Sequence, residues 1–125
     1  MGKIQAMTGN TAAYTGAALC RPDLIAAYPI TPQSSVIEGL AGLVFTATSA
    51  QGLALMYEPY FRMSTLRIPM VMAIATREMT SPETIWSGQQ DAMSVRDAGW
   101  IVMFAENAQE AYDNTVCAFR IAENP

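Results

Sequence analysis

The sequence contains no histidine, and this absence removes several kinds of chemistry. Histidine is the commonest general base and the usual partner of a serine or cysteine nucleophile. Zinc sites usually combine histidine with cysteine, and iron–sulfur clusters need closely spaced thiolates. The two cysteines, Cys20 and Cys117, lie far apart and form no C-x-x-C pair. We therefore expect no metal or cluster site in this chain alone, and we expect both cysteines to act as small buried hydrophobic residues.

Charge is also scarce, because charged residues make up only 14% of the chain and the net charge is -4. The seven basic residues do not cluster, whereas a nucleic-acid-binding surface needs a basic face. The longest apolar run, around residues 68–75, is far shorter than the ~20 residues of a membrane helix. The first residues lack the apolar core of a signal peptide. We expect no nucleic-acid or membrane partner, and a cytoplasmic location.

Hydrophobic residues are abundant, at 51% of 125 residues. This length suits one domain, and a lone domain of this size buries only about two-thirds of its unfolded surface. The surplus of apolar residues indicates burial against other subunits or missing segments. A core rich in methionine and alanine is the alternative explanation, and composition leaves both open.

Predicted strands and helices alternate along the chain, which favours an α/β domain with a parallel sheet and helices on both faces. The run at 68–75 is typical of a central parallel strand. Pro59 should kink the helix in which it lies. Asn107 and Glu110 resemble a capping box. Strands are expected at 24–28, 43–48, 68–75 and 100–105, and helices at 8–19, 33–40, 49–66 and from 108 onward.

Ligands of open parallel sheets bind beyond the carboxyl ends of the strands, and three predicted segments lie there: 28–33, 48–52 and 76–78. Thr31 is a hydroxyl held between two prolines, which suits either a ligand contact or a plain turn. Arg77 could bind a carboxylate through two parallel hydrogen bonds, or pair with Glu78 or Glu83 at the surface. Residues 48–52 could cradle a cofactor or simply cap a helix.

The region between residues 76 and 98 is predicted to be a long polar loop. Asp91, Arg96 and Asp97 are candidates for bracing it, although exposed charges of this sort usually add little stability.

Several motifs occur in one order along nearly the whole chain, and together they closely resemble a known domain. This is the N-terminal pyrimidine-binding domain of the alpha subunit of 2-oxoacid:ferredoxin oxidoreductases. The pyruvate:ferredoxin oxidoreductases (pyruvate synthases) are its best-known members. The motifs are Thr8–Asn10, Tyr28–Pro32, Phe45–Leu53, Arg96–Trp100 and Ala105–Asp113.

The resemblance implies a thiamin-diphosphate-binding fold in an enzyme that oxidatively decarboxylates a 2-oxoacid, pyruvate being the first expectation. Such enzymes use coenzyme A, release CO2 and pass electrons through iron–sulfur clusters to ferredoxin. By the same resemblance, Thr31 contacts the substrate near the thiamin ring and Arg77 binds its carboxylate. The residues expected near the cofactor are Tyr28, Pro29, Ile30, Pro32, Ser49, Gln51 and Gly52.

The resemblance also implies that this chain cannot act alone. In the family, the diphosphate and Mg²⁺ are held on another domain, usually another subunit, and the clusters lie elsewhere in the complex. The expected partners are therefore beta-, gamma- and delta-type subunits, ferredoxin and a small 2-oxoacid.

One departure from the family concerns the join at Ala41–Gly42. Members carry several dozen further residues there, including a glutamate that hydrogen-bonds the thiamin aminopyrimidine and drives its activation. No residue of this chain can be assigned that role, and Glu38 and Glu58 lie outside the matching position. We expect the chain to be a fragment of a longer subunit with a segment missing near 41–42.

Two further readings remain open. A non-catalytic interaction domain of the same fold would explain the absent glutamate. A pyrimidine domain of a transketolase-like protein is a weaker alternative, because the motifs at 28–32 and 96–100 argue against it.

Overall fold

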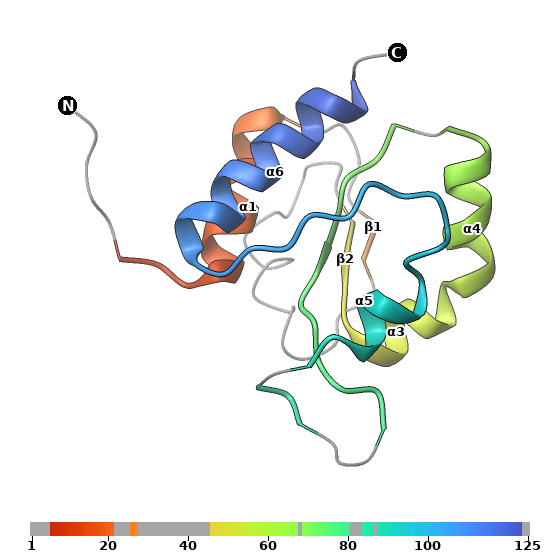
Figure 1. Cartoon of the computed structure of the whole chain (residues 1–125). Coiled ribbons are helices and arrows are strands. Elements are labelled where there is room, and N and C mark those ends of the chain that lie inside the picture. Colours follow the sequence, from red (N-terminus) through yellow and green to blue (C-terminus); the bar gives the residue numbers. More distant parts are fainter. Residues whose placement is uncertain are drawn as a thin grey trace.

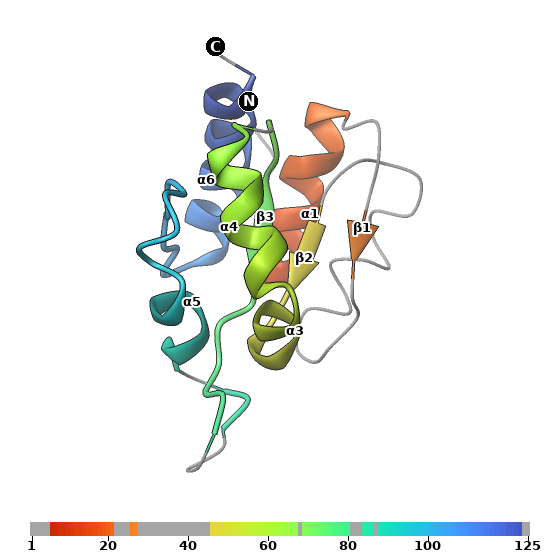
Figure 2. The ribbon, with the colours of Figure 1, turned by 90° about the vertical axis from the view of Figure 1, so that its right-hand side faces the viewer.

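The computed structural model describes residues 6–21, 26–27, 46–67, 69–80, 84–86 and 88–123. Helices cover both faces of a small sheet, as the two perpendicular views show (Figures 1 and 2). One face carries α1 (Gly9–Cys20) and α6 (Ala108–Ala122), which lie side by side. The other side carries α3 (Ala50–Leu55), α4 (Tyr57–Thr65) and α5 (Gln90–Ser94). The predicted α/β class with helices on both faces is confirmed.

The described strands are parallel and follow the order β1 (Ala26–Ala27), β2 (Thr46–Thr48), β3 (Met72–Ile74). In the register, Thr46 pairs with both Ala26 and Met72. The prediction of a central strand at 68–75 was wrong for the described sheet, where β3 is the outer strand. Its residues are accordingly half-buried, while those of β2 are buried. The helix predicted at 33–40 lies outside the described residues.

The sheet separates two hydrophobic clusters, because alternate residues of a strand point to opposite faces. Val71 and Ala73 pack toward Ala17 of α1 and Phe119 of α6. Met72 and Ile74 pack toward a second cluster on the side of α3 and α4. That second cluster is built from Leu53, Tyr60, Val95 and Ala98. One strand therefore anchors both layers.

The two longest helices begin where local sequence signals predict. Thr8 caps α1, since its hydroxyl oxygen accepts the Thr11 N–H at 3.2 Å. Asn107 caps α6, and its side-chain oxygen accepts the Glu110 N–H at 2.9 Å. The Glu110 carboxylate accepts from the Asn107 side-chain amide and from the Glu106 N–H, rather than from the Asn107 backbone N–H of a standard capping box, so the predicted box is confirmed only in part. Arg21 follows α1 in a left-handed conformation common at helix ends, and its N–H donates to the Ala18 carbonyl at 3.3 Å.

The helix predicted at 49–66 is two helices, and Pro59 explains the break. A proline ring inside a helix clashes with the carbonyl four residues earlier, which here belongs to Leu55. The structure ends α3 at Leu55 and begins α4 at Tyr57. Pro59 then lies in the first turn of α4, where the N–H that it lacks has no partner within the helix.

The segment 100–105 was predicted to be a buried strand, and that prediction was wrong. The structure assigns it no strand and leaves its apolar side chains exposed after the half-buried Trp100, Ile101 by 70% and Phe104 by 48%. An unbroken apolar run satisfies the pattern of a buried strand, but burial needs a covering layer. The region predicted as a loop at 76–98 also contains the short helix α5.

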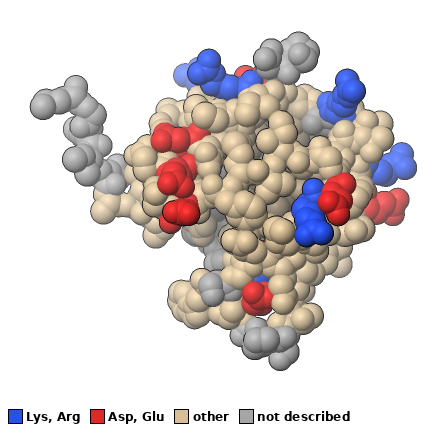
Figure 3. Space-filling model, in the orientation of Figure 1, with Lys and Arg blue, Asp and Glu red and all other residues tan. Residues whose placement is uncertain are grey.

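The cysteine prediction was correct only in part. Cys20 is half-buried and packs at the edge of the cluster around Ala17, but Cys117 is exposed on α6. Within the described residues, no helix is both long and apolar enough to span a bilayer. Much of the face in Figure 3 carries neither sign of charge, and its basic side chains are scattered rather than gathered into a patch.

Candidate functional site

The carboxyl ends of β2 and β3 meet and are bonded to each other. The Ala75 N–H donates to the Thr48 carbonyl at 3.1 Å, which extends the pairing past the strands. The Ser49 hydroxyl donates to the Ala75 carbonyl at 2.6 Å. Thr48 and Ser49 are fully buried. The loops leaving the two strands, residues 48–52 and 75–79, therefore form one rigid surface at the edge where parallel sheets bind ligands.

Asp91, from α5, ties these two loops together from beneath. Its Oδ2 accepts the N–H of Ala50 at 2.9 Å and that of Arg77 at 3.1 Å. Its Oδ1 accepts the N–H of Ala92 at 2.8 Å. The side chain is completely buried. Backbone N–H groups thus satisfy a charge that would be costly to bury without partners.

Arg77 leaves the end of β3 and reaches toward α3. Its Nη2 donates to Gln51 Oε1 at 2.6 Å, and the Gln51 amide nitrogen donates to the Met79 carbonyl at 2.9 Å. Arg77 and Gln51 are both half-buried. The guanidinium is therefore held at a partly desolvated position, where it interacts with an anion more strongly than it would in bulk water.

Ala50 has a φ of 36°, which is uncommon for a residue with a side chain. It begins α3 and is completely buried. Such a conformation costs about 1–2 kcal/mol outside glycine and persists only where the surroundings impose it. The bond from its N–H to Asp91 is one such constraint.

A small cavity lies beside Arg77. It measures about 260 Å³ and is lined by Arg77, Glu78, Thr84, Ile85 and Trp86. Trp86 is 89% exposed, so the cavity is open to solvent on the side of this residue. The volume lies below the range for drug-sized ligands, which suits a small acid.

Gly88 fixes the loop next to this cavity. It has a φ of 146°, and a side chain there would lie 2.7 Å from the Glu78 backbone nitrogen. Only glycine accommodates both this backbone conformation and this close approach. The absence of a side chain at Gly88 therefore lets this loop lie directly against Glu78.

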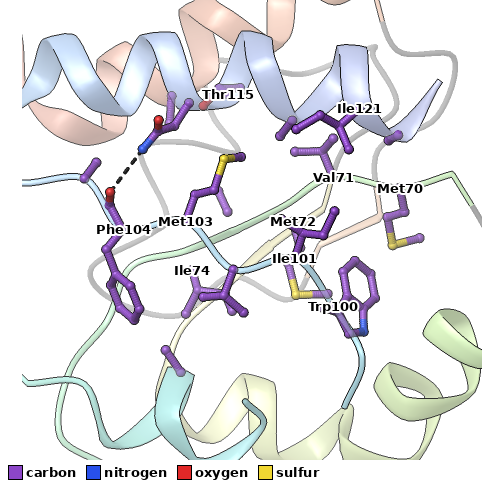
Figure 4. A pocket seen from close by; sticks show the side chains of 18 of the residues that line it. Met70, Val71, Met72, Ile74, Trp100, Ile101, Met103, Phe104, Thr115 and Ile121 are labelled. Carbon is purple, nitrogen blue, oxygen red and sulfur yellow. Dashed lines mark hydrogen bonds between the residues drawn. The ribbon is translucent and has the colours of Figure 1, made fainter. Parts of the chain in front are cut away.

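A larger cavity, of about 670 Å³, lies between β3, the segment 100–105 and α6. Figure 4 shows the side chains that line this cavity, most of which are apolar. Among them, Met72, Ile74, Ile101 and Met103 face its interior. The Asn114 amide donates to the Phe104 carbonyl at 3.1 Å at its rim. The lining of this cavity is mainly apolar, whereas charged and polar side chains line the small cavity beside Arg77.

The structure brings together four residues predicted for the site: Ser49, Gln51, Gly52 and Arg77. Gly52 is buried, and its N–H donates to the Ser49 carbonyl at 2.9 Å. The other predicted residues lie outside the described residues: Tyr28, Pro29, Ile30, Thr31 and Pro32. Glu83, one proposed partner of Arg77, also lies outside them.

Asp91 has a larger part than the sequence indicated. It braces the loop as predicted, but Arg96 and Asp97 form an exposed pair at 3.7 Å that touches neither strand end. Nothing in the spacing around Asp91 shows that its carboxylate reaches two distant loops. An acidic residue within an otherwise uncharged stretch was the one available signal.

Among the residues that the structure describes, no three Asp, Glu, His or Cys side chains come together as a metal site. The polar groups at the strand ends are hydroxyls, an amide, one guanidinium and two carboxylates, of which that of Asp91 is occupied by backbone N–H groups and that of Glu78 lines the small cavity. They suit an uncharged ring or a small carboxylate better than they suit a metal-bound diphosphate.

Residues 40–125 match the family described as pyruvate flavodoxin/ferredoxin oxidoreductase, thiamine diphosphate-binding domain. The chain belongs to this family. It is 42% identical to the alpha subunit of NADH-dependent phenylglyoxylate dehydrogenase of Aromatoleum evansii, over 98% of the chain and 37% of the relative. It is 38% identical to pyruvate synthase subunit PorA of Methanocaldococcus jannaschii, over 99% of the chain and 40% of the relative.

A third relative is the ketoisovalerate oxidoreductase subunit VorA of Pyrococcus furiosus, which is 38% identical over 94% of the chain and 38% of the relative. The chain thus spans about two-fifths of the length of the curated relatives that it matches. The first alignment covers 154 positions, whereas the chain has 125 residues. Part of the relatives' aligned sequence therefore has no counterpart here.

Proposed function

We propose that this chain is the substrate-facing domain of a 2-oxoacid:ferredoxin oxidoreductase, in which Arg77 binds the carboxylate of the 2-oxoacid. The observation that carries the proposal is the Arg77 guanidinium, held by Gln51 at the carboxyl end of β3 and beside a small cavity. The similarity to subunits named for pyruvate, ketoisovalerate and phenylglyoxylate supports it, because all these substrates share a 2-oxo carboxylate.

Thiamin diphosphate is the cofactor that the family description implies. When bound, it supplies the carbon nucleophile that attacks the 2-oxo carbon. Ser49, Gln51 and Gly52 lie at the strand ends where its uncharged ring end would be held. The Thr48 hydroxyl, fully buried and without a hydrogen-bond partner among the described residues, adds an unused polar group there. The diphosphate and Mg²⁺ would be held by another domain or subunit.

The chain's own residues bind and orient the substrate. A guanidinium opposite the carboxylate fixes one end of the 2-oxoacid, so the carbonyl carbon is presented in one direction. Thr31 is proposed to contact the substrate near the thiamin ring, together with its neighbours Tyr28, Pro29, Ile30 and Pro32. Trp86 and Ile85 offer an apolar surface for the substrate's side chain.

The complete reaction needs partners. Cleavage of the 2-oxoacid with coenzyme A releases CO2, and the electrons of the broken carbon–carbon bond pass through iron–sulfur clusters to ferredoxin. We propose that beta-, gamma- and delta-type subunits provide the clusters and the remaining cofactor contacts, in a cytoplasmic complex. Pyruvate is the proposed substrate, although the relatives' names extend to larger 2-oxoacids.

The proposal is tested by replacing Arg77 with alanine in the assembled complex and measuring kcat/KM for the 2-oxoacid. Losing a charge-assisted contact should cost about 1.5–3 kcal/mol, which lowers kcat/KM roughly 10- to 150-fold. Arg77→Lys is the matched control, since it keeps the charge but loses the planar fork, and it should retain part of the activity. Unchanged kcat/KM in Arg77→Ala removes this residue from the site.

A second candidate function is a non-catalytic interaction domain of the same fold. It is favoured by the part of the relatives' aligned sequence that has no counterpart here. We propose that this part lies at Ala41–Gly42 and includes the glutamate that activates thiamin. Glu58 is not proposed to replace that glutamate, because it lies outside the matching position and is exposed on α4.

Intact-mass measurement of the native subunit separates the two candidates. A mass near 13.5 kDa supports a truncated interaction domain. A much larger mass means that the native chain contains further residues, and the catalytic reading then stands.

A further inference from the structure

The backbone of Arg77 and the start of α3 are bonded to the same carboxylate oxygen. Asp91 Oδ2 accepts the N–H of Arg77 at 3.1 Å and the N–H of Ala50 at 2.9 Å. Ala50 directly precedes Gln51. The side-chain oxygen of Gln51 accepts a hydrogen bond from the Arg77 guanidinium at 2.6 Å. Asp91 therefore fixes the main chain of Arg77 and that of Ala50, the residue directly before Gln51.

A purely structural role does not require a charge at this position. Burying a carboxylate is costly, and well-packed apolar residues often stabilise a protein at least as well as buried charged groups. The structure nevertheless buries Asp91 completely and uses its oxygens for three backbone N–H groups. It also holds Ala50 at a φ of 36°. An arrangement of this kind is typical of sites whose geometry matters more than their stability.

Arginine is a flexible side chain, and fixing it before a ligand arrives lowers the entropy lost on binding. The main chain of Arg77 is held by Asp91, and its terminal nitrogen is held by Gln51. Gln51 is itself held by its bond to the Met79 carbonyl at 2.9 Å. The guanidinium is thus fixed at both ends, on a frame built from α3, α5 and the loop after β3.

We propose that Asp91 is a positioning residue which, together with Gln51, presents the Arg77 guanidinium to the carboxylate of the 2-oxoacid. This inference rests on the proposed function of Arg77. Asp91 touches no substrate itself, and its effect on binding passes through Arg77.

The experiment measures the affinity of the assembled complex for two probes by isothermal titration calorimetry, without coenzyme A and without thiamin diphosphate, so that the 2-oxoacid binds but does not react. Pyruvate carries the carboxylate, and pyruvamide replaces it with a neutral amide of similar shape. The readout is the ratio of the two dissociation constants, which reports recognition of the carboxylate and does not require turnover. The variants are Arg77→Ala, Asp91→Asn and the double variant. Thr115→Val is the control, since Thr115 is a buried hydroxyl of α6 bonded to Ala111 and remote from Arg77.

In Asp91→Asn, an amide N–H₂ group replaces one acceptor, so at least one backbone N–H loses its partner. The preference for pyruvate over pyruvamide should fall about 10-fold, and Arg77→Ala should reduce it by at least as much. The double variant should show no lower preference than Arg77→Ala alone, because both changes remove one interaction. Thr115→Val should keep the wild-type preference even where its melting temperature falls.

Two outcomes overturn the positioning role while Arg77→Ala still lowers the preference. In one, Asp91→Asn weakens pyruvate and pyruvamide equally, which is the behaviour of a merely structural residue. In the other, the effects of Asp91→Asn and Arg77→Ala multiply. If Arg77→Ala itself leaves the preference unchanged, the proposed function of Arg77 fails, and the positioning role fails with it.

If Asp91→Asn does not fold or assemble, Gln51→Met carries the test. It removes the hydrogen-bond partner of the guanidinium, nearly conserves volume and leaves the bonds of Asp91 in place. It should lower the preference for pyruvate in the wild-type background but not in the Arg77→Ala background. An unchanged preference in the wild-type background contradicts the positioning role.

Discussion

The contact between Arg77 and Gln51 gives a sharp test at the scale of single residues. Replacing Gln51 with glutamate sets a carboxylate against the guanidinium at the 2.6 Å position now taken by a neutral amide. The new carboxylate competes with the substrate's carboxylate, so Gln51→Glu should raise KM for the 2-oxoacid at least ~10-fold, with a smaller change in kcat. Gln51→Met, which adds no charge, should raise KM less. Equal effects of the two variants in steady-state kinetics would show that charge competition is not involved.

The two cysteines should differ in reactivity. Burial, and then the nearby Glu123 carboxylate, raise the pKa of the Cys20 thiol. A raised pKa leaves less of the reactive thiolate at neutral pH, whereas Cys117 is exposed. A disulfide reagent monitored by absorbance should modify Cys117 in a fast phase and Cys20 in a slow one. Cys117→Ser should eliminate the fast phase, and a fast phase that persists in this variant contradicts the assignment.

The positions of site residues were predictable from sequence only where a pattern along the chain carried them. Arg77 and Gln51 lie where strand ends and family motifs placed them, and the structure shows that they are in contact. The role of Asp91 could not be predicted, because its partners are backbone groups of residues distant in sequence. Hydrogen bonds to main-chain N–H groups leave no trace in the identity of the donor residue.

At the scale of elements, α1 and α6 pack closely because Gly16 has no side chain. A Cβ at Gly16 would lie 3.0 Å from the Tyr112 carbonyl oxygen and 3.1 Å from Thr115 Cβ, whereas one at Gly9 would meet nothing within 4 Å. Both glycines lie in α1, so they form a matched pair. Gly16→Ala should lower the free energy of unfolding by about 1–3 kcal/mol. Gly9→Ala should leave it unchanged or raise it slightly. Urea denaturation of both variants tests this, and equal stabilities contradict close packing at Gly16.

Tyr60 links α4 to the segment 100–105 and should make stability depend on alkaline pH. Its ring stacks on Trp100 with centroids 4.7 Å apart, and the Trp100 indole donates to its carbonyl at 2.9 Å. Burial raises the pKa of the Tyr60 phenol. A raised pKa in the folded state means that this stabilising contribution is complete below about pH 10 and is lost as the pH rises through the folded value.

Urea denaturation across this pH range is the measurement. The free energy of unfolding of the wild type should fall above about pH 10, and Tyr60→Phe should fall less steeply over the same range. Identical slopes for the two proteins would show that Tyr60 ionises as freely when folded as when unfolded.

Helix ends were predictable because their signals are local. Thr8, Asn107 and Glu110 satisfy nearby backbone groups whatever surrounds them. Pro59 was predicted to kink a helix, and the structure shows a complete break. The failure at 100–105 has the opposite cause, since whether an apolar segment is buried depends on what packs over it. No local pattern reports that.

At the scale of the whole molecule, the apolar surplus of the sequence is partly at the surface. Trp86, Leu55 and Ile101 are each more than two-thirds exposed. Exposed apolar surface of this extent commonly marks interaction sites. We predict that the segment 100–105 is covered in the complex with the other subunits. Hydrogen exchange measured by mass spectrometry should show slower exchange there in the complex than in the isolated chain, while α1, already packed, changes little. Unchanged exchange at 100–105 contradicts this prediction.

The fold class was predictable because alternation of strands and helices extends over the chain, and the family because its motifs do. Whether the chain contains the whole domain was less predictable from the sequence. The join at Ala41–Gly42 stays a prediction that rests on the resemblance to the family, because no local feature of the sequence marks a missing segment.

This chain is proposed to act in a 2-oxoacid oxidoreductase by binding the carboxylate of the substrate at Arg77. The most direct measurement is 2-oxoacid-dependent reduction of ferredoxin, or of a viologen dye, by the assembled complex with coenzyme A and thiamin diphosphate. We expect reduction with pyruvate or a larger 2-oxoacid, and we expect it to be lost when this chain is omitted. Arg77→Ala should impair it strongly. Full activity without this chain, or undiminished activity in Arg77→Ala, would contradict the proposed function.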